Sequence, residues 1–135
     1  MTTKNNKERM LKNIKSEIEL YIRKAEKRNT YAMEYVATDY EFFFQWYADE
    51  MFINTKRIEY FKAMLEVSDF ENVEVLEDQI SDRIINCEME ILNTSCLETQ
   101  AGEMRTMANR LNIESKRSIL KELRNLLNFA TEERE

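Results

Sequence analysis

The chain contains no proline and a single glycine, Gly102, among its 135 residues. Tight turns and β-hairpins rely on these two residues, because glycine tolerates positive φ angles and proline fixes φ at the value that many turns require. Helices joined by short polar segments have no such need. The sequence therefore predicts an all-α fold, and the length predicts one domain that covers residues 1–135.

Hydrophobic residues make up 43% of the chain and charged residues 34%, which is typical of globular rather than disordered proteins. The longest apolar runs, such as Phe42, Phe43 and Phe44, are far shorter than the about 20 residues of a membrane-spanning helix. The N-terminal residues are polar and lack the apolar segment of a secretory signal, and Cys87 and Cys96 are expected to be free thiols. These features predict a cytoplasmic protein that does not contact the membrane.

Apolar residues recur every three or four positions in four parts of the chain, which is the spacing of an amphipathic helix. The predicted helices cover residues 4–28, 31–66, 69–93 and 95–132. Asn29 and Thr30 mark the first break. Because the connections are short, neighbouring helices must run antiparallel, and the sequence predicts an antiparallel bundle of four main helices.

Two capping boxes, each a serine followed three residues later by a glutamate, are expected to open the third and fourth helices. The first joins Ser68 to Glu71 and the second joins Ser95 to Glu98. The apolar pattern of the last segment continues past Asn112, where a bend or a split would also fit. One long helix and two shorter ones both remain open for this segment.

The second predicted helix carries an unusual concentration of aromatic residues. Eleven of the fourteen aromatic side chains lie between Tyr31 and Phe61. At helical spacing they form two adjacent stripes, which together cover more than half of the helix circumference. The first stripe is expected to be core, has Asn54 as its one polar member, and otherwise consists of Met33, Val36, Ala37, Tyr40, Phe43, Phe44, Tyr47, Met51, Ile58, Phe61 and Leu65.

The second stripe supplies the candidate partner-binding residues, because tyrosine and tryptophan carry polar groups that need a partner when they are buried. It consists of Tyr31, Tyr35, Phe42, Trp46, Ile53 and Tyr60. A core position and an interface position are both compatible with this pattern. The main hypothesis is that these residues form an aromatic helix face, through which the chain binds a protein partner or forms a homo-oligomer.

The residue types exclude several chemistries. The chain contains no histidine, which removes histidine-activated nucleophiles and imidazole metal ligands, and its one glycine cannot form a phosphate-binding loop. Acidic residues cluster in the third predicted helix at Glu71, Glu74, Glu77, Asp78 and Asp82. This cluster is compatible with a Mg²⁺-dependent activity or with a solvated acidic face, and the solvated face is favoured. The sequence therefore predicts a protein that is not an enzyme, with no catalytic residues, no metal site and no cofactor.

The charge is distributed unevenly along the chain. Residues 1–30 carry a net charge of +5, residues 31–102 carry −12 and residues 103–135 carry +1. This pattern predicts that basic terminal segments lie beside an acidic middle. An alternative is that the acidic middle acts as an inhibitor that occupies the nucleic-acid channel of a partner.

A second alternative is a small nucleic-acid-binding regulator with a helix-turn-helix-like segment around Asn112. The candidate nucleic-acid-binding residues are Lys116, Arg117, Lys121 and Arg124. An accessory basic patch would consist of Lys4, Lys7, Arg9, Lys12 and Lys15.

Overall fold

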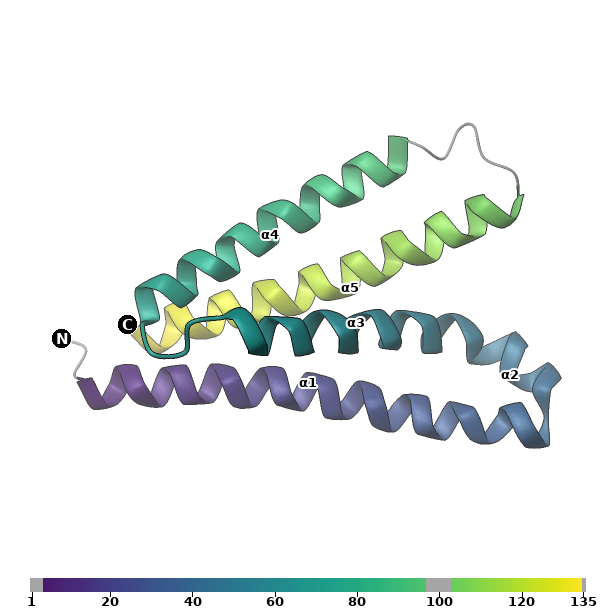
Figure 1. Cartoon of the computed structure of the whole chain (residues 1–135), viewed down its shortest axis with the longest axis horizontal. Helices are drawn as coiled ribbons and strands as arrows, with labels where there is room; N and C mark the ends of the chain where they lie inside the picture. The colour runs from purple at the N-terminus through teal and green to yellow at the C-terminus, as the bar shows by residue number, and fades with distance from the viewer. Residues whose placement is uncertain (1–3, 97–102, 135) are drawn as a thin grey trace.

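The computed structural model describes residues 4–96 and 103–134, and within these ranges it contains five α-helices and no strand. The four long helices are α1 (Lys4–Thr38), α3 (Ala48–Val67), α4 (Val73–Cys96) and α5 (Glu103–Arg134). A short helix, α2 (Tyr40–Trp46), joins α1 to α3. Successive long helices run in opposite directions, and the start of α1 and the end of α5 lie at the same end of the bundle (Figure 1). The predicted all-α, antiparallel bundle of four main helices is confirmed.

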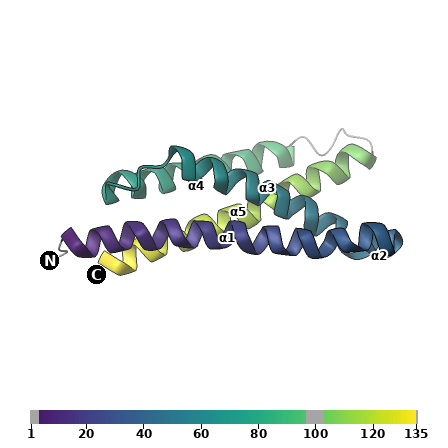
Figure 2. The same ribbon diagram turned by 60° about the horizontal axis from the view of Figure 1, so that its bottom comes forward.

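The hydrophobic core draws on all four long helices and lies toward the end of the bundle where α1 begins and α5 ends. It contains Met10, Leu11, Ile14, Ile18, Ile22, Phe61, Met64, Val73, Leu76, Ile80, Ile84, Cys87, Ile119, Leu120, Leu123 and Leu126. Toward the other end, α4 and α5 diverge from α1 and α3, as Figures 1 and 2 both show. The α2 end therefore has fewer neighbours to cover its apolar side chains.

The predicted break at Asn29 and Thr30 is wrong, because α1 continues through both residues to Thr38. The side chain of Asn29 donates to the hydroxyl of Thr55 in α3, with 3.1 Å between Nδ2 and Oγ1. The Thr30 hydroxyl donates to the carbonyl of Glu26 one turn earlier, at 3.0 Å. Neither side chain accepts the N–H group of a following helix, so neither acts as a cap.

The chain instead breaks at Asp39, where φ is −157° and ψ is 80°. The Asp39 carboxylate accepts a hydrogen bond from the backbone N–H of Phe42 at 3.2 Å, which is the N-cap arrangement that starts α2. A second irregularity at Tyr47 separates α2 from α3. The single helix predicted for residues 31–66 is therefore divided among the end of α1, all of α2 and most of α3.

The capping box predicted at Ser68 and Glu71 does not form, and α4 begins later, at Val73. The side chain of Asn72 accepts a hydrogen bond from the N–H group of Val75 at 3.1 Å and so caps the helix. The carboxylate of Asp69 accepts from the N–H groups of Glu71 and Asn72, at 2.8 and 3.2 Å, and shapes the preceding turn.

Replacing Asn72 by alanine is expected to lower the free energy of unfolding by about 1 kcal/mol, because the N–H group of Val75 loses its acceptor. Urea denaturation followed by circular dichroism measures this loss. The matched control is Ser68→Ala, since the Ser68 hydroxyl has no hydrogen-bond partner among the described residues. An equal or larger loss in the Ser68 variant would mean that the capping box predicted from the sequence is the true helix start.

The last segment is one helix, since α5 runs without interruption from Glu103 to Arg134 and passes through Asn112. Ile113, Ser115 and Ile119, which all follow Asn112, are buried, so the inward face of α5 begins directly after this residue. The Ser115 hydroxyl donates to the carbonyl of Asn112 at 2.7 Å and needs no turn to do so. Of the second predicted capping box, Ser95 lies within α4, whereas Glu98 lies outside the described residues, as does Gly102.

Candidate interaction surface

Four aromatic rings pack together where α1 ends and α3 begins, and we refer to them as the aromatic cluster: Tyr31, Tyr35, Phe42 and Tyr47. The rings of Tyr35 and Tyr47 are stacked at 8° with 5.2 Å between their centroids. Phe42 lies 4.9 Å from Tyr35, and Tyr31 lies 5.9 Å from Tyr47 in an edge-on arrangement. These contacts are the favourable offset and edge geometries of aromatic pairs, and they hold α2 against α1.

A hydrogen bond between two tyrosine hydroxyl groups also stabilises the aromatic cluster. The hydroxyl groups of Tyr31 and Tyr35 lie 3.1 Å apart, and this hydrogen bond is the main reason that the pKa of Tyr35 is raised to about 12. The pKa of Tyr47 is also raised, chiefly by its removal from water. Both phenols are neutral at physiological pH. Their rings provide apolar contact area, and their hydroxyl groups can form hydrogen bonds.

An Arg–Glu pair joins the two helices beside the aromatic cluster. Arg28 of α1 donates from Nε to Glu50 Oε1 at 2.7 Å and from a terminal nitrogen to Glu50 Oε2 at 3.0 Å. This hydrogen-bonded guanidinium lowers the pKa of the Glu50 carboxyl. This bidentate pair fixes both the distance between the two side chains and their relative orientation. It therefore holds α1 and α3 in register next to α2.

Helix α2 presents three exposed aromatic side chains, Tyr40, Phe44 and Trp46, which we call the aromatic tip. Their exposed fractions are 63%, 70% and 63%. Phe43 is only 8% exposed, and its ring packs edge-on against that of Phe44, with 5.3 Å between the centroids, so one buried ring anchors α2 while the other three stay open to solvent. Figure 1 places α2 at the end of the bundle remote from the first turn of α1.

The first aromatic stripe is therefore core only in part. Phe43 and Phe61 are buried as predicted. Five other members of the stripe are exposed, and for them the core prediction is wrong: Met33, Val36, Ala37, Tyr40 and Phe44. The reason is their position along the bundle axis. They lie at the α2 end, where α4 and α5 have diverged from α1 and α3 (Figure 2).

The six candidate partner-binding residues lie on three helices and do not form one face. Tyr31, Tyr35 and Phe42 belong to the aromatic cluster, and Trp46 belongs to the aromatic tip. Ile53 and Tyr60 lie further along α3 and are half-buried.

Tyr60 points to the interior of the bundle rather than to the aromatic tip. Its ring lies 5.5 Å from that of Phe61, and the guanidinium of Arg83 in α4 lies 5.2 Å from its centroid. The sequence pattern did not identify Tyr40 and Phe44 as surface residues. Helical spacing shows which residues share a face, but it does not show where along the helix a neighbouring helix stops covering that face.

Two basic residues of α5 form ion pairs with the acidic helix α4. Lys116 pairs with Glu90 at 2.7 Å and Arg124 with Glu88 at 3.6 Å, whereas Arg117 and Lys121 are exposed. The predicted turn at Asn112 is absent, so the helix-turn-helix interpretation of this segment is wrong as a structure.

The N-terminal basic segment also reaches α4. Lys7 pairs with Glu74 at 3.2 Å, and the ammonium group of Lys15 lies 5.7 Å from the ring centroid of Phe70, just before α4. Together with the pairs from α5, these contacts place basic segments from both ends of the chain beside the acidic middle, as predicted.

The acidic residues of α4 do not converge on a metal-binding arrangement. In the part of the chain that the structure describes, no group of three or more Cys, Asp or Glu side chains is placed to hold a metal ion. Cys87 is a free, buried thiol that donates to the carbonyl of Lys116 at 3.2 Å, and burial raises the pKa of this thiol. It therefore acts as a packing residue rather than as a reactive thiolate.

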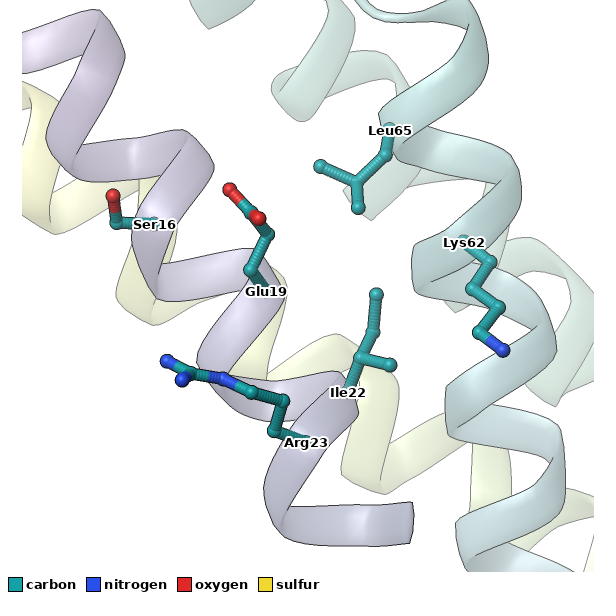
Figure 3. Close-up of a pocket in the computed structure, with 6 residues that line it drawn as sticks. All are labelled: Ser16, Glu19, Ile22, Arg23, Lys62 and Leu65. Carbon is teal, nitrogen blue, oxygen red and sulfur yellow. The ribbon is translucent and has the colours of Figure 1, made fainter.

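A depression of about 410 Å³ lies between α1 and α3, on the flank of the bundle. Figure 3 shows that Ile22 and Leu65 face the space between the two helices, whereas Arg23 extends away from α3. The lining also includes one acidic residue, Glu19, one further basic residue, Lys62, and the hydroxyl-bearing Ser16.

Within residues 4–96 and 103–134, none of the helices is both long and apolar enough to cross a membrane. Comparison of the chain with protein-family models, with curated proteins and with solved structures gave no significant match.

Proposed function

We propose that this chain is a non-enzymatic helical interaction module that binds a protein partner through the aromatic tip. The observation that carries the proposal is the exposure of Tyr40, Phe44 and Trp46, at 63%, 70% and 63%, on a single seven-residue helix. Each aromatic side chain can bury about 150–250 Å² of surface, so leaving three of them in water is costly unless a partner covers them.

The aromatic cluster supports the proposal because it gives the aromatic tip a rigid base. Tyr35 and Tyr47 are stacked beneath α2, and Arg28 and Glu50 hold the flanking helices together. A surface that is already ordered loses little conformational entropy on binding, which is a general property of tight protein interfaces. Aromatic residues are also the residue type most enriched among the side chains that dominate binding energies.

The test is an unbiased selection of ligands. A display library of random peptides is selected on the wild-type chain, and the Kd of each enriched peptide is measured by fluorescence anisotropy. The double variant Tyr40→Ala/Phe44→Ala is expected to bind these peptides at least about 30-fold more weakly, because the loss of even one such anchor costs about 2 kcal/mol or more. Circular dichroism establishes that the variant keeps its helices.

The matched control is Val67→Ala, which removes a side chain that is 65% exposed at the opposite end of α3. Peptides that bind the double variant as tightly as the wild type would contradict the proposal. Sedimentation equilibrium addresses a second copy of the chain as the occupant. A dimer that Tyr40→Ala/Phe44→Ala dissociates would replace the separate partner by self-association.

A further inference from the structure

The segment that builds the aromatic tip contains no positive charge. Between Tyr31 and Thr55 there is no lysine or arginine, although the whole chain contains 20 of them. The same segment contains five acidic residues: Glu34, Asp39, Glu41, Asp49 and Glu50. The segment that carries the exposed rings is therefore negative, and cations reach it only from other parts of the chain.

Two of these five carboxylates are neutralised within the bundle. Glu50 pairs with Arg28 at 2.7 Å, and Asp49 lies 3.9 Å from Arg110 of α5. The structure gives no ion pair to Glu34, Asp39 or Glu41 within the described residues, and all three are exposed. Glu41 and Phe44 are three residues apart on α2 and so are neighbours on its surface.

The chain elsewhere places cations over its own partly exposed rings. Lys15 lies 5.7 Å from the ring centroid of Phe70, Lys56 lies 5.8 Å from that of Phe52, and Arg83 lies 5.2 Å from that of Tyr60. In the described part of the chain, no cation is placed in this way over the rings of the aromatic tip. These rings therefore have both an open face and adjacent carboxylates.

We propose that the aromatic tip binds a lysine- and arginine-rich amphipathic segment of another protein. This inference rests on the proposed function and specifies the partner. The apolar side of such a segment would cover Tyr40 and Phe44, while its cations would pair with Glu34 and Glu41 and lie over the face of Trp46. Anionic surfaces, including nucleic acids and acidic lipids, would be repelled by the same carboxylates.

The test uses three synthetic helical peptides of about 18 residues, which is five turns. The three share one apolar face, and their polar positions carry lysine and arginine, serine and glutamine, or glutamate. Fluorescence anisotropy of the labelled peptides gives Kd for the wild-type chain. The cationic peptide is expected to bind about tenfold more tightly than the neutral peptide, and the advantage should shrink as salt is added.

The variant Glu34→Gln/Glu41→Gln removes two of the three carboxylates that have no ion pair and leaves the third, Asp39, to cap α2. It is expected to lose most of the preference for the cationic peptide and to bind the neutral peptide as the wild type does. The matched control, Asp78→Asn/Asp82→Asn, changes the net charge equally on the exposed side of α4 and is expected to keep the preference.

Two outcomes would overturn the inference in distinguishable ways. Equal binding of the cationic and neutral peptides, with both lost in Tyr40→Ala/Phe44→Ala, would refute the basic partner and leave the aromatic tip as an interface. A cationic preference that is the same in the tip and α4 charge variants would show non-specific attraction to an acidic protein. Unchanged cationic binding in Tyr40→Ala/Phe44→Ala would refute both the inference and the proposed function.

Discussion

Replacing Phe61 by alanine is expected to lower the free energy of unfolding by about 3–5 kcal/mol, the range for a large aromatic side chain lost from a packed core. Phe61 is 0% exposed in α3. Its ring lies 5.5 Å from those of Tyr21 in α1 and Tyr60 in the same helix. The substitution leaves a cavity at the point where α1 and α3 meet the rest of the bundle, and neighbouring helices can fill it only in part.

Urea denaturation measures this loss, and Phe44→Ala is the matched control. Both phenylalanines belong to the same apolar stripe of the sequence, but Phe44 is 70% exposed and its removal is expected to change stability by less than about 0.5 kcal/mol. Comparable losses in the two variants would contradict the described burial. They would mean that the α2 end packs as tightly as the rest of the bundle.

Breaking the ion pair between Arg57 of α3 and Glu122 of α5 is expected to have a similarly large effect. The two side chains are only 21% and 12% exposed, and Arg57 also donates to Oδ1 of the buried Asn54 at 3.0 Å. Burial lowers the pKa of the Arg57 guanidinium, which reflects the cost of removing a charge from water. Arg57→Ala or Glu122→Ala alone leaves the other charge buried and unpaired, and each is expected to cost about 3–5 kcal/mol.

The double variant Arg57→Met/Glu122→Leu is expected to lose less stability than either single variant. Arg57 Nε and Glu122 Oε2 have no hydrogen-bond partner among the described residues, so the pair does not recover its full desolvation cost. A double-mutant cycle by urea denaturation, in which Arg57→Met and Glu122→Leu are also made singly, gives the coupling energy between the two sites. Additive losses would mean that the two side chains do not interact in solution.

Much of the fold follows from helical periodicity. Two apolar stripes are buried as their spacing predicts: Leu11, Ile14 and Ile18 in α1, and Leu76, Ile80 and Ile84 in α4. Helix boundaries are harder to predict from the sequence, because several polar side chains near a boundary can form the capping hydrogen bond and only one of them does. Asn29 bonds to Thr55 across the bundle instead of capping a helix, and Asn72 caps α4 instead of Ser68.

The candidate surface could be predicted only in part. The aromatic segment is identifiable from composition, and Trp46 is one of the candidate partner-binding residues, for which the sequence leaves a core and an interface position both open. Phe44 and Phe61 share one stripe, yet one is exposed and the other is buried. The difference lies in their distance from the point where α4 and α5 diverge, and that distance is a property of the whole bundle.

The arrangement of the helices also determines where the aromatic tip would lie if the chain were attached to a surface at one end of the bundle. The first turn of α1 and the last turn of α5 lie together at one end, and α2 lies at the other (Figure 1). The 35 residues of α1 span about 50 Å, because an α-helix rises about 1.5 Å per residue. Attachment near either of these turns would therefore hold the aromatic rings well away from the supporting surface, where a large partner could approach them from outside.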